Sequence, residues 1–166
     1  ARAAAPAPPF RPAPPTMDWL IDTKLAPPAA FGRMVSRGYA MDRLRAALGG
    51  HATLLVAPAG YGKTELLSRW YHQCRDEGLR VGWLSLEPDD AQIEAFVDYA
   101  LAALGEPPAA NAATAPITRR AAASRLLAAT LTDPGRTLLF LDDFERLGGA
   151  LDDLVRLLIE RTSPRL

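Results

Sequence analysis

The residues best suited to chemistry form the stretch 57–64, which reads APAGYGKT. An apolar run, residues 53–56, precedes it, and a helix-like segment, residues 65–77, follows it. A polyphosphate needs several backbone N–H donors, and a loop that closes onto a helix N-terminus supplies them together with the positive end of the helix dipole. Gly60 and Gly62 permit the close backbone approach that side chains would forbid. We therefore interpret this stretch as a phosphate-binding loop between a strand and a helix.

Two side chains complete the predicted loop. Lys63 can reach the β and γ phosphates of a nucleotide, and Thr64 can offer its hydroxyl to Mg²⁺. One position departs from the general motif, because Ala57 stands where a first glycine is expected. A glycine-bearing turn with a chance Gly-Lys-Thr sequence is the alternative interpretation. The predicted phosphate-binding residues are Pro58, Ala59, Gly60, Tyr61, Gly62, Lys63 and Thr64.

A second candidate site lies at residues 137–143, which read TLLFLDD. The apolar run is typical of a strand buried on both faces, and its carboxyl end is the edge of an α/β sheet where ligands bind. We expect Asp142 to face the threonine of the loop and to hold Mg²⁺ through water. Asp143, or alternatively Glu145, would orient or polarise the attacking water. An apolar run followed by two aspartates is common by itself, so this assignment depends on the loop upstream.

These residues require a parallel sheet to position them. The hydrophobic patterns predict strands at 52–56, 80–86 and 137–141. They predict helices at 39–48, 65–77, 89–104, 118–131 and 150–161, with Asp89 and Asp90 at the N-cap of the third helix. The expected fold class is α/β, in the form of a P-loop three-layer parallel sheet with helices on both faces.

Composition narrows the classes of protein. A length of 166 residues fits one domain, and 19 basic and 19 acidic side chains give no net charge, so neither a DNA-binding surface nor a membrane anchor is predicted. The single Cys74 excludes an internal disulfide, and no Cys/His cluster has metal-ligand spacing. No apolar run is long enough to span a bilayer, and no signal peptide is present, so we expect a cytoplasmic protein.

The N-terminal segment differs from the rest. Residues 1–16 are almost entirely Ala, Pro and Arg, a composition that disfavours packing. We expect a disordered leader over 1–22 and a nucleotide-binding domain over 23–166. A proline-rich ligand for a recognition domain is the alternative interpretation of the leader.

Five motifs in order resemble a known family. They are TKL with two prolines at 23–28, VSR at 35–37, the loop at 57–64, WLSL at 83–86 followed by an acidic pair, and LFLDD at 139–143. This combination resembles the nucleotide-binding domain of the large ATP-binding LuxR-type transcriptional regulators, which belong to the STAND class of P-loop ATPases. The resemblance implies ATP and Mg²⁺ as ligands, slow hydrolysis at most, and self-association of the full-length protein.

The resemblance also implies roles for individual residues. Members of this family often carry Ala or Ser at the first loop position, so Ala57 fits the pattern. An arginine near the adenine is implied at Arg37, with Val35 as its apolar neighbour. In such regulators DNA is bound by a C-terminal helix-turn-helix, which this sequence does not contain. In this class of P-loop fold, the strand that follows the helix corresponding to 150–161 lies between the loop strand and the strand corresponding to 137–141. We therefore expect an N-terminal part of the domain that lacks the middle of its sheet.

Two other functions stay open at this point. An AAA-type motor or a small-molecule kinase would use the same loop for sustained turnover. A degenerate fragment that binds no nucleotide would keep the motifs without the activity. The function that the resemblance implies is an ATP-dependent switch module of a signal-responsive transcriptional activator. Nucleotide binding and the rate of hydrolysis distinguish the two alternatives from it.

Overall fold

Two apolar segments of the chain pair as a parallel sheet, β1 (Arg80–Ser85) and β2 (Thr137–Asp142). The computed structural model describes residues 22–29, 38–107, 116–130 and 135–161. The register pairs Arg80 with Thr137 and Ser85 with Asp142, so both strands end at the same edge. Parallel strands need a long crossover connection, which α3 and α4 provide here.

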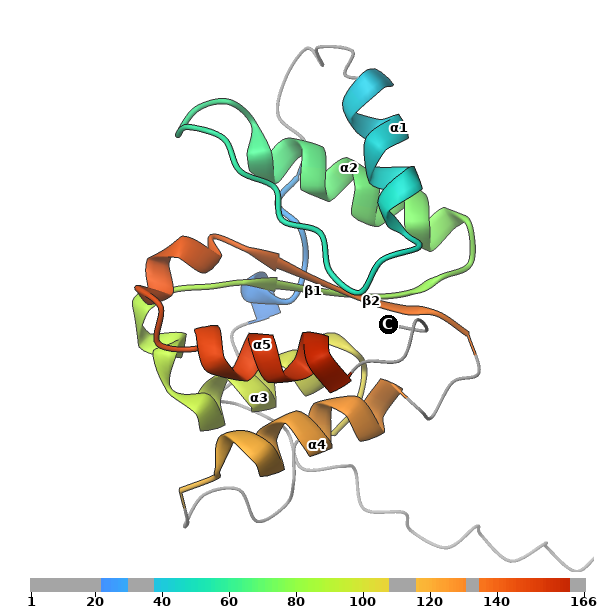
Figure 1. Cartoon of the computed structure of the whole chain (residues 1–166). Helices are drawn as coiled ribbons and strands as arrows, with labels where there is room; N and C mark the ends of the chain where they lie inside the picture. Colours follow the sequence, from blue (N-terminus) through green and yellow to red (C-terminus); the bar gives the residue numbers. More distant parts are fainter. Residues whose placement is uncertain (1–21, 30–37, 108–115, 131–134, 162–166) are drawn as a thin grey trace, which may run out of the picture.

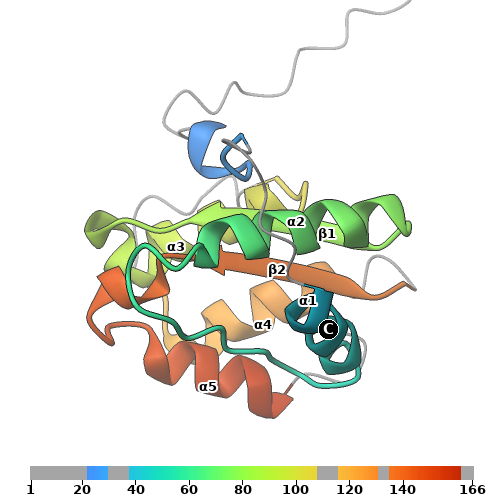
Figure 2. The ribbon, with the colours of Figure 1, turned by 90° about the horizontal axis from the view of Figure 1, so that it is seen from above.

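Helices cover both faces of this sheet (Figure 1). Helices α1 and α2 lie on one face, and α3, α4 and α5 lie on the other (Figures 1 and 2). The five α-helices of the described residues are α1 (Gly38–Ala47), α2 (Lys63–Asp76), α3 (Ile93–Ala103), α4 (Arg119–Thr130) and α5 (Asp152–Arg161). Three short 3-10 helices accompany them, η1 (Asp22–Lys24), η2 (Pro88–Ala91) and η3 (Phe144–Leu147). The chain therefore has the mixed α/β character that the sequence predicts.

The sheet separates two hydrophobic clusters, because successive strand residues point to opposite faces. Leu84 is buried with Phe96 on the face of α3, α4 and α5. Trp83 and Phe140 are buried with Trp70 on the face of α1 and α2. The rings of Trp83 and Phe140, which are paired in register, stack with centroids 6.2 Å apart. The two-stranded sheet is therefore packed against helices on both of its faces.

The predicted strand at 52–56 is wrong for the described structure. Residues 52–58 are extended but belong to neither a strand nor a helix. Leu54 and Val56 are 85% and 79% exposed, whereas Leu55 packs against the cluster under α2. A strand exists only where its backbone pairs with a neighbour, and within the described ranges β1 and β2 pair only with each other.

The acidic pair at 89–90 also has a different place from the predicted one. It lies in η2, and α3 begins later, with Gln92 at its N-cap. The Asp90 carboxylate instead accepts the backbone N–H of Glu87 and is 2% exposed. The other predicted helices and the strands at 80–86 and 137–141 are confirmed to within two residues at each end.

The predicted leader 1–22 falls outside the described residues, except for its last residue. In the described ranges, every helix is too short or too polar to cross a bilayer.

Candidate functional site

The loop before α2 has the backbone geometry that its glycines permit. Gly60 and Gly62 have φ values of 81° and 71°, in the left-handed region that favours glycine. Between them, the N–H of Tyr61 donates to the carbonyl oxygen of Pro58 over 3.3 Å. Gly62 is the N-cap of α2, which begins at Lys63. The loop therefore delivers its backbone directly to the positive end of a 14-residue helix.

The loop threonine and the aspartate at the end of β2 meet across the site. The Thr64 hydroxyl Oγ1 donates to Asp142 Oδ1 over 3.1 Å, although 78 residues separate them. Asp142 is the last residue of β2 and is 7% exposed. Burial raises the pKa of its carboxyl group, with the charges of Asp143 and Glu145 acting in the same direction and the Thr64 hydrogen bond opposing them.

Lys63 is held by two oxygen atoms at the mouth of the loop. Its ammonium group donates to the carbonyl oxygen of Ala57 over 2.8 Å and lies 3.5 Å from a carboxylate oxygen of Glu145. The pKa of Glu145 is lowered, first by a hydrogen bond from its own backbone and then by the charge of Lys63. The Glu145 side chain is 64% exposed, so this ion pair is weak enough for a ligand to replace it.

The two candidate carboxylates for water activation lie in different surroundings. Asp143 has φ 58°, a left-handed conformation that aspartate tolerates better than most residues. Its carboxylate pairs with Arg146 over 3.2 Å, on the same turn. Glu145 is the one that approaches Lys63. The geometry thus brings Glu145 to the loop lysine, and the choice between the two carboxylates stays a prediction.

A solvent-open groove of about 770 Å³ continues from the loop. It begins at Gly62 and Thr64 and runs along α2 as far as Asp76. Pro28 and Ala29 also line it, together with side chains of α1. Its volume is within the range of small-molecule sites. The sequence gave no sign that Pro28 and Ala29 border a groove.

The residues implied for adenine lie elsewhere in the chain. Val35 and Arg37 are outside the described residues, so their assignment stays a prediction. The last described residues before them in the sequence are Pro28 and Ala29, which line the groove.

The donor set of the site fits a hydrated Mg²⁺ better than a metal held by protein alone. Within the described residues no group of three or more His, Cys, Asp or Glu side chains converges as a metal site. Thr64 and Asp142 supply two oxygen ligands or water contacts. Mg²⁺ commonly keeps several waters and takes the rest of its ligands from phosphates, so two protein oxygens are enough.

A comparison of the sequence with models of known protein families finds no match.

Proposed function

We propose that this chain binds Mg²⁺ and ATP as the switch module of a signal-responsive LuxR-type transcriptional activator. One contact supports the proposal most strongly, the hydrogen bond between Thr64 and Asp142. A phosphate-binding loop and an acidic strand end are each common patterns. A hydroxyl and a buried carboxylate 3.1 Å apart at a helix N-terminus are the pair of groups that a magnesium and phosphate site would use.

The loop residues would bind the phosphates. The backbone N–H groups of residues 58–64 would donate to the phosphate oxygens, and Lys63 would leave the Ala57 carbonyl for the β and γ phosphates. Bound Mg²⁺ would neutralise phosphate charge, with Thr64 and Asp142 holding it directly or through water. The raised pKa of Asp142 supports this, because a divalent cation would compensate a carboxylate that burial disfavours as an anion.

The nucleoside would lie in the groove along α2. The groove starts at the loop, where the phosphates would end, and Pro28 and Ala29 offer apolar atoms for the base. Val35 and Arg37 would add the adenine contacts that the resemblance implies.

We also propose that the complete domain has the three-layer P-loop fold. A three-layer P-loop sheet would place a further strand beside β2. Two observations support it. Within the described part β2 has one paired edge, and Leu54 and Val56 expose apolar side chains that such a strand would help to cover.

A turnover ATPase is the second candidate function. The approach of Glu145 to Lys63 favours it, because a carboxylate beside the γ-phosphate position can orient an attacking water. A switch and a motor share the binding site and differ in rate. Sustained hydrolysis coupled to work on a substrate would support the motor, and slow hydrolysis that resets an assembled state would support the switch.

Sedimentation of the full-length protein tests the switch function. We expect ATP with Mg²⁺ to shift the protein toward a larger assembly, whereas ADP does not, and DNA binding to follow assembly through C-terminal regions of such regulators. Lys63→Ala should remove the shift. Arg156→Ala, a change at a 69% exposed residue on α5, should preserve it. An assembly state that is the same with ATP, with ADP and without nucleotide would contradict the switch.

A further inference from the structure

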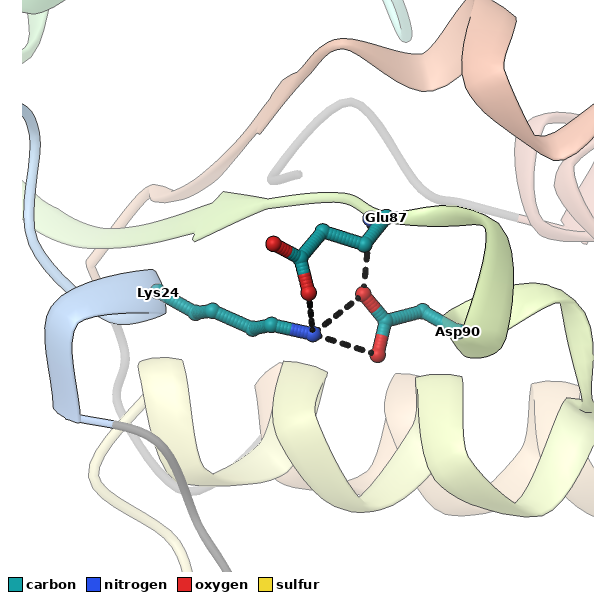
Figure 3. Close-up of polar contacts among 3 residues, drawn as sticks. All are labelled: Lys24, Glu87 and Asp90. Atoms are coloured by element: carbon teal, nitrogen blue, oxygen red, sulfur yellow. Dashed lines mark hydrogen bonds and ion pairs between the residues drawn. The ribbon is translucent and has the colours of Figure 1, made fainter.

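Lys24 is a buried cation outside the phosphate site. It ends η1 and is 7% exposed. Its ammonium group lies 3.0 and 2.9 Å from the two carboxylate oxygens of Asp90 and 2.8 Å from Oε2 of Glu87 (Figure 3). The ring of Tyr99 lies beneath it, with the nitrogen 5.1 Å from the centroid. Lysine is almost never buried without such partners.

The three charged groups, which we call the Lys24 clamp, depend on one another. Burial lowers the pKa of Lys24, but the hydrogen bonds and charges of Glu87 and Asp90 outweigh it and the net pKa is raised. The Lys24 contact likewise lowers the pKa of Glu87. Asp90 is 2% exposed, so removal of the ammonium group leaves a buried carboxylate without its cation.

An ion cluster that attaches a chain segment carries a desolvation cost, because its charged groups leave water. Apolar side chains of similar volume often stabilise a protein as well as a buried ion pair does, because desolvation offsets much of the attraction. A cluster with three hydrogen bonds fixes direction more narrowly than apolar packing does. The clamp is therefore suited to setting where the segment after Lys24 runs.

That segment leads to the candidate nucleotide groove. Residues 22–29 pass the outer edge of β1, from the side of α3 to the side of α2 (Figures 1 and 2). Leu25 packs against the cluster under α3. Pro28 and Ala29, four and five residues after Lys24, line the groove that starts at the phosphate loop. Four to five residues span at most about 13–18 Å, so a fixed Lys24 keeps both residues within that distance of it.

We infer that Lys24, Glu87 and Asp90 are positioning residues, which hold Pro28 and Ala29 in the groove wall where the base and ribose of the nucleotide would bind. The inference rests on the proposed function for the identity of the ligand. The clamp touches neither the phosphate loop nor Thr64 and Asp142 among the described contacts. Its link to the groove therefore runs through the residues that follow Lys24, and we expect loss of Lys24 to affect the nucleoside end more than the phosphate end.

Two ligands separate the two ends. Mg-ATP fills both, whereas inorganic tripolyphosphate with Mg²⁺ fills the phosphate end alone. For Lys24→Met in the full-length protein, calorimetric titration should give an ATP Kd at least about tenfold weaker and a tripolyphosphate Kd within about twofold of wild type. Equal loss of both affinities, or no change in either, would overturn the inference.

A matched control separates positioning from general loss of stability. Arg125→Met breaks the ion pair between Arg125 and Asp98, which lies on α4 and α3 without a segment leading to the groove. It should lower thermal stability and leave the ratio of the two affinities unchanged. If it changes the ratio as Lys24→Met does, the positioning role is wrong. Should Lys24→Met fail to fold, Glu87→Gln replaces it, because Glu87 is 53% exposed and Lys24 keeps Asp90 as a partner. The expected ratio change is then smaller and of the same sign.

Failure of the proposed function would show in the wild-type protein, as no binding of either ligand. In that case, the position of the arm, residues 25–29, is measured directly. One spin label is placed on Ala29→Cys, in the groove along α2, and the other on Asp153→Cys, in α5. Helices α2 and α5 lie on opposite faces of the sheet (Figure 1), and double electron–electron resonance reports the distribution of distances between the labels. A broader distribution in Lys24→Met supports the clamp, and an unchanged distribution overturns it.

Discussion

Replacement of Asp142 by asparagine should stabilise the nucleotide-free protein while weakening its ligand site. Asparagine keeps the oxygen that accepts the Thr64 hydrogen bond, which spans 3.1 Å. It removes a carboxylate whose pKa is raised by burial and by the nearby Asp143 and Glu145. Removal of a disfavoured buried charge at a functional site should raise the free energy of unfolding by about 0.5–2 kcal/mol. For a chain of this size, 1 kcal/mol corresponds to a Tm increase of roughly 2–4 °C.

The pH dependence gives the sign of this effect. Because the folded pKa of Asp142 is raised, the folded state holds the proton more tightly than the unfolded state does. Wild-type stability from this group is therefore present at low pH and is lost as pH rises from the ordinary aspartate value through the raised one. Asp142→Asn does not lose this stability as the pH rises, because asparagine does not titrate. The difference in free energy of unfolding between variant and wild type should grow from acid to neutral pH in urea titrations.

The ligand side of the prediction has the opposite sign. If Asp142 holds Mg²⁺ through water, its loss should weaken the Mg²⁺-dependent affinity for ATP by about 10–100-fold. Asp153→Asn is the control, because this carboxylate is 57% exposed on α5. It should change stability by less than about 0.5 kcal/mol and leave ATP binding unchanged. The reasoning is refuted if Asp142→Asn destabilises the protein at neutral pH and leaves the effect of Mg²⁺ unchanged.

Three further predictions concern packing, charge and reactivity. Gly82→Ala should lower the free energy of unfolding by about 1–3 kcal/mol in urea, because a Cβ would lie 2.9 Å from the Ala103 carbonyl oxygen, and unchanged stability would mean that α3 yields easily. Glu145→Gln should strengthen metal-free tripolyphosphate binding about two- to fivefold at low salt, since Lys63 loses an exposed counter-charge; a weaker affinity would contradict this. Cys74 is 1% exposed and burial raises its pKa to about 11, so a thiol reagent at pH 8 should modify it only after denaturant unfolds the protein.

Local patterns predicted the parts of the site that depend on neighbours in the chain. The glycines at 60 and 62 and the helix that follows are adjacent in sequence, and the positive φ values agree with the expected loop. The strand ending at Asp142 was predictable because its apolar run is buried from both sides. The approach of Thr64 to Asp142 followed from placing both at one sheet edge.

The features that the sequence did not predict depend on contacts between residues far apart in the chain. The segment 52–56 has the composition of a strand, but pairing depends on a neighbour that a local pattern does not reveal. Asp90 does cap a helix start, but it is that of η2, where it accepts the backbone N–H of Glu87. Its ionic partner, Lys24, is 66 residues away, and no local pattern indicates it. The approach of Glu145 to Lys63 likewise depends on how η3 turns after β2.

Calorimetric titration of ATP into the full-length protein, with and without Mg²⁺, tests the central claim most directly. We predict saturable binding that Mg²⁺ strengthens and that Lys63→Ala abolishes, while Arg156→Ala leaves it unchanged. The absence of saturable binding in the wild-type protein, or binding that Lys63→Ala does not weaken, would contradict a nucleotide site at this loop.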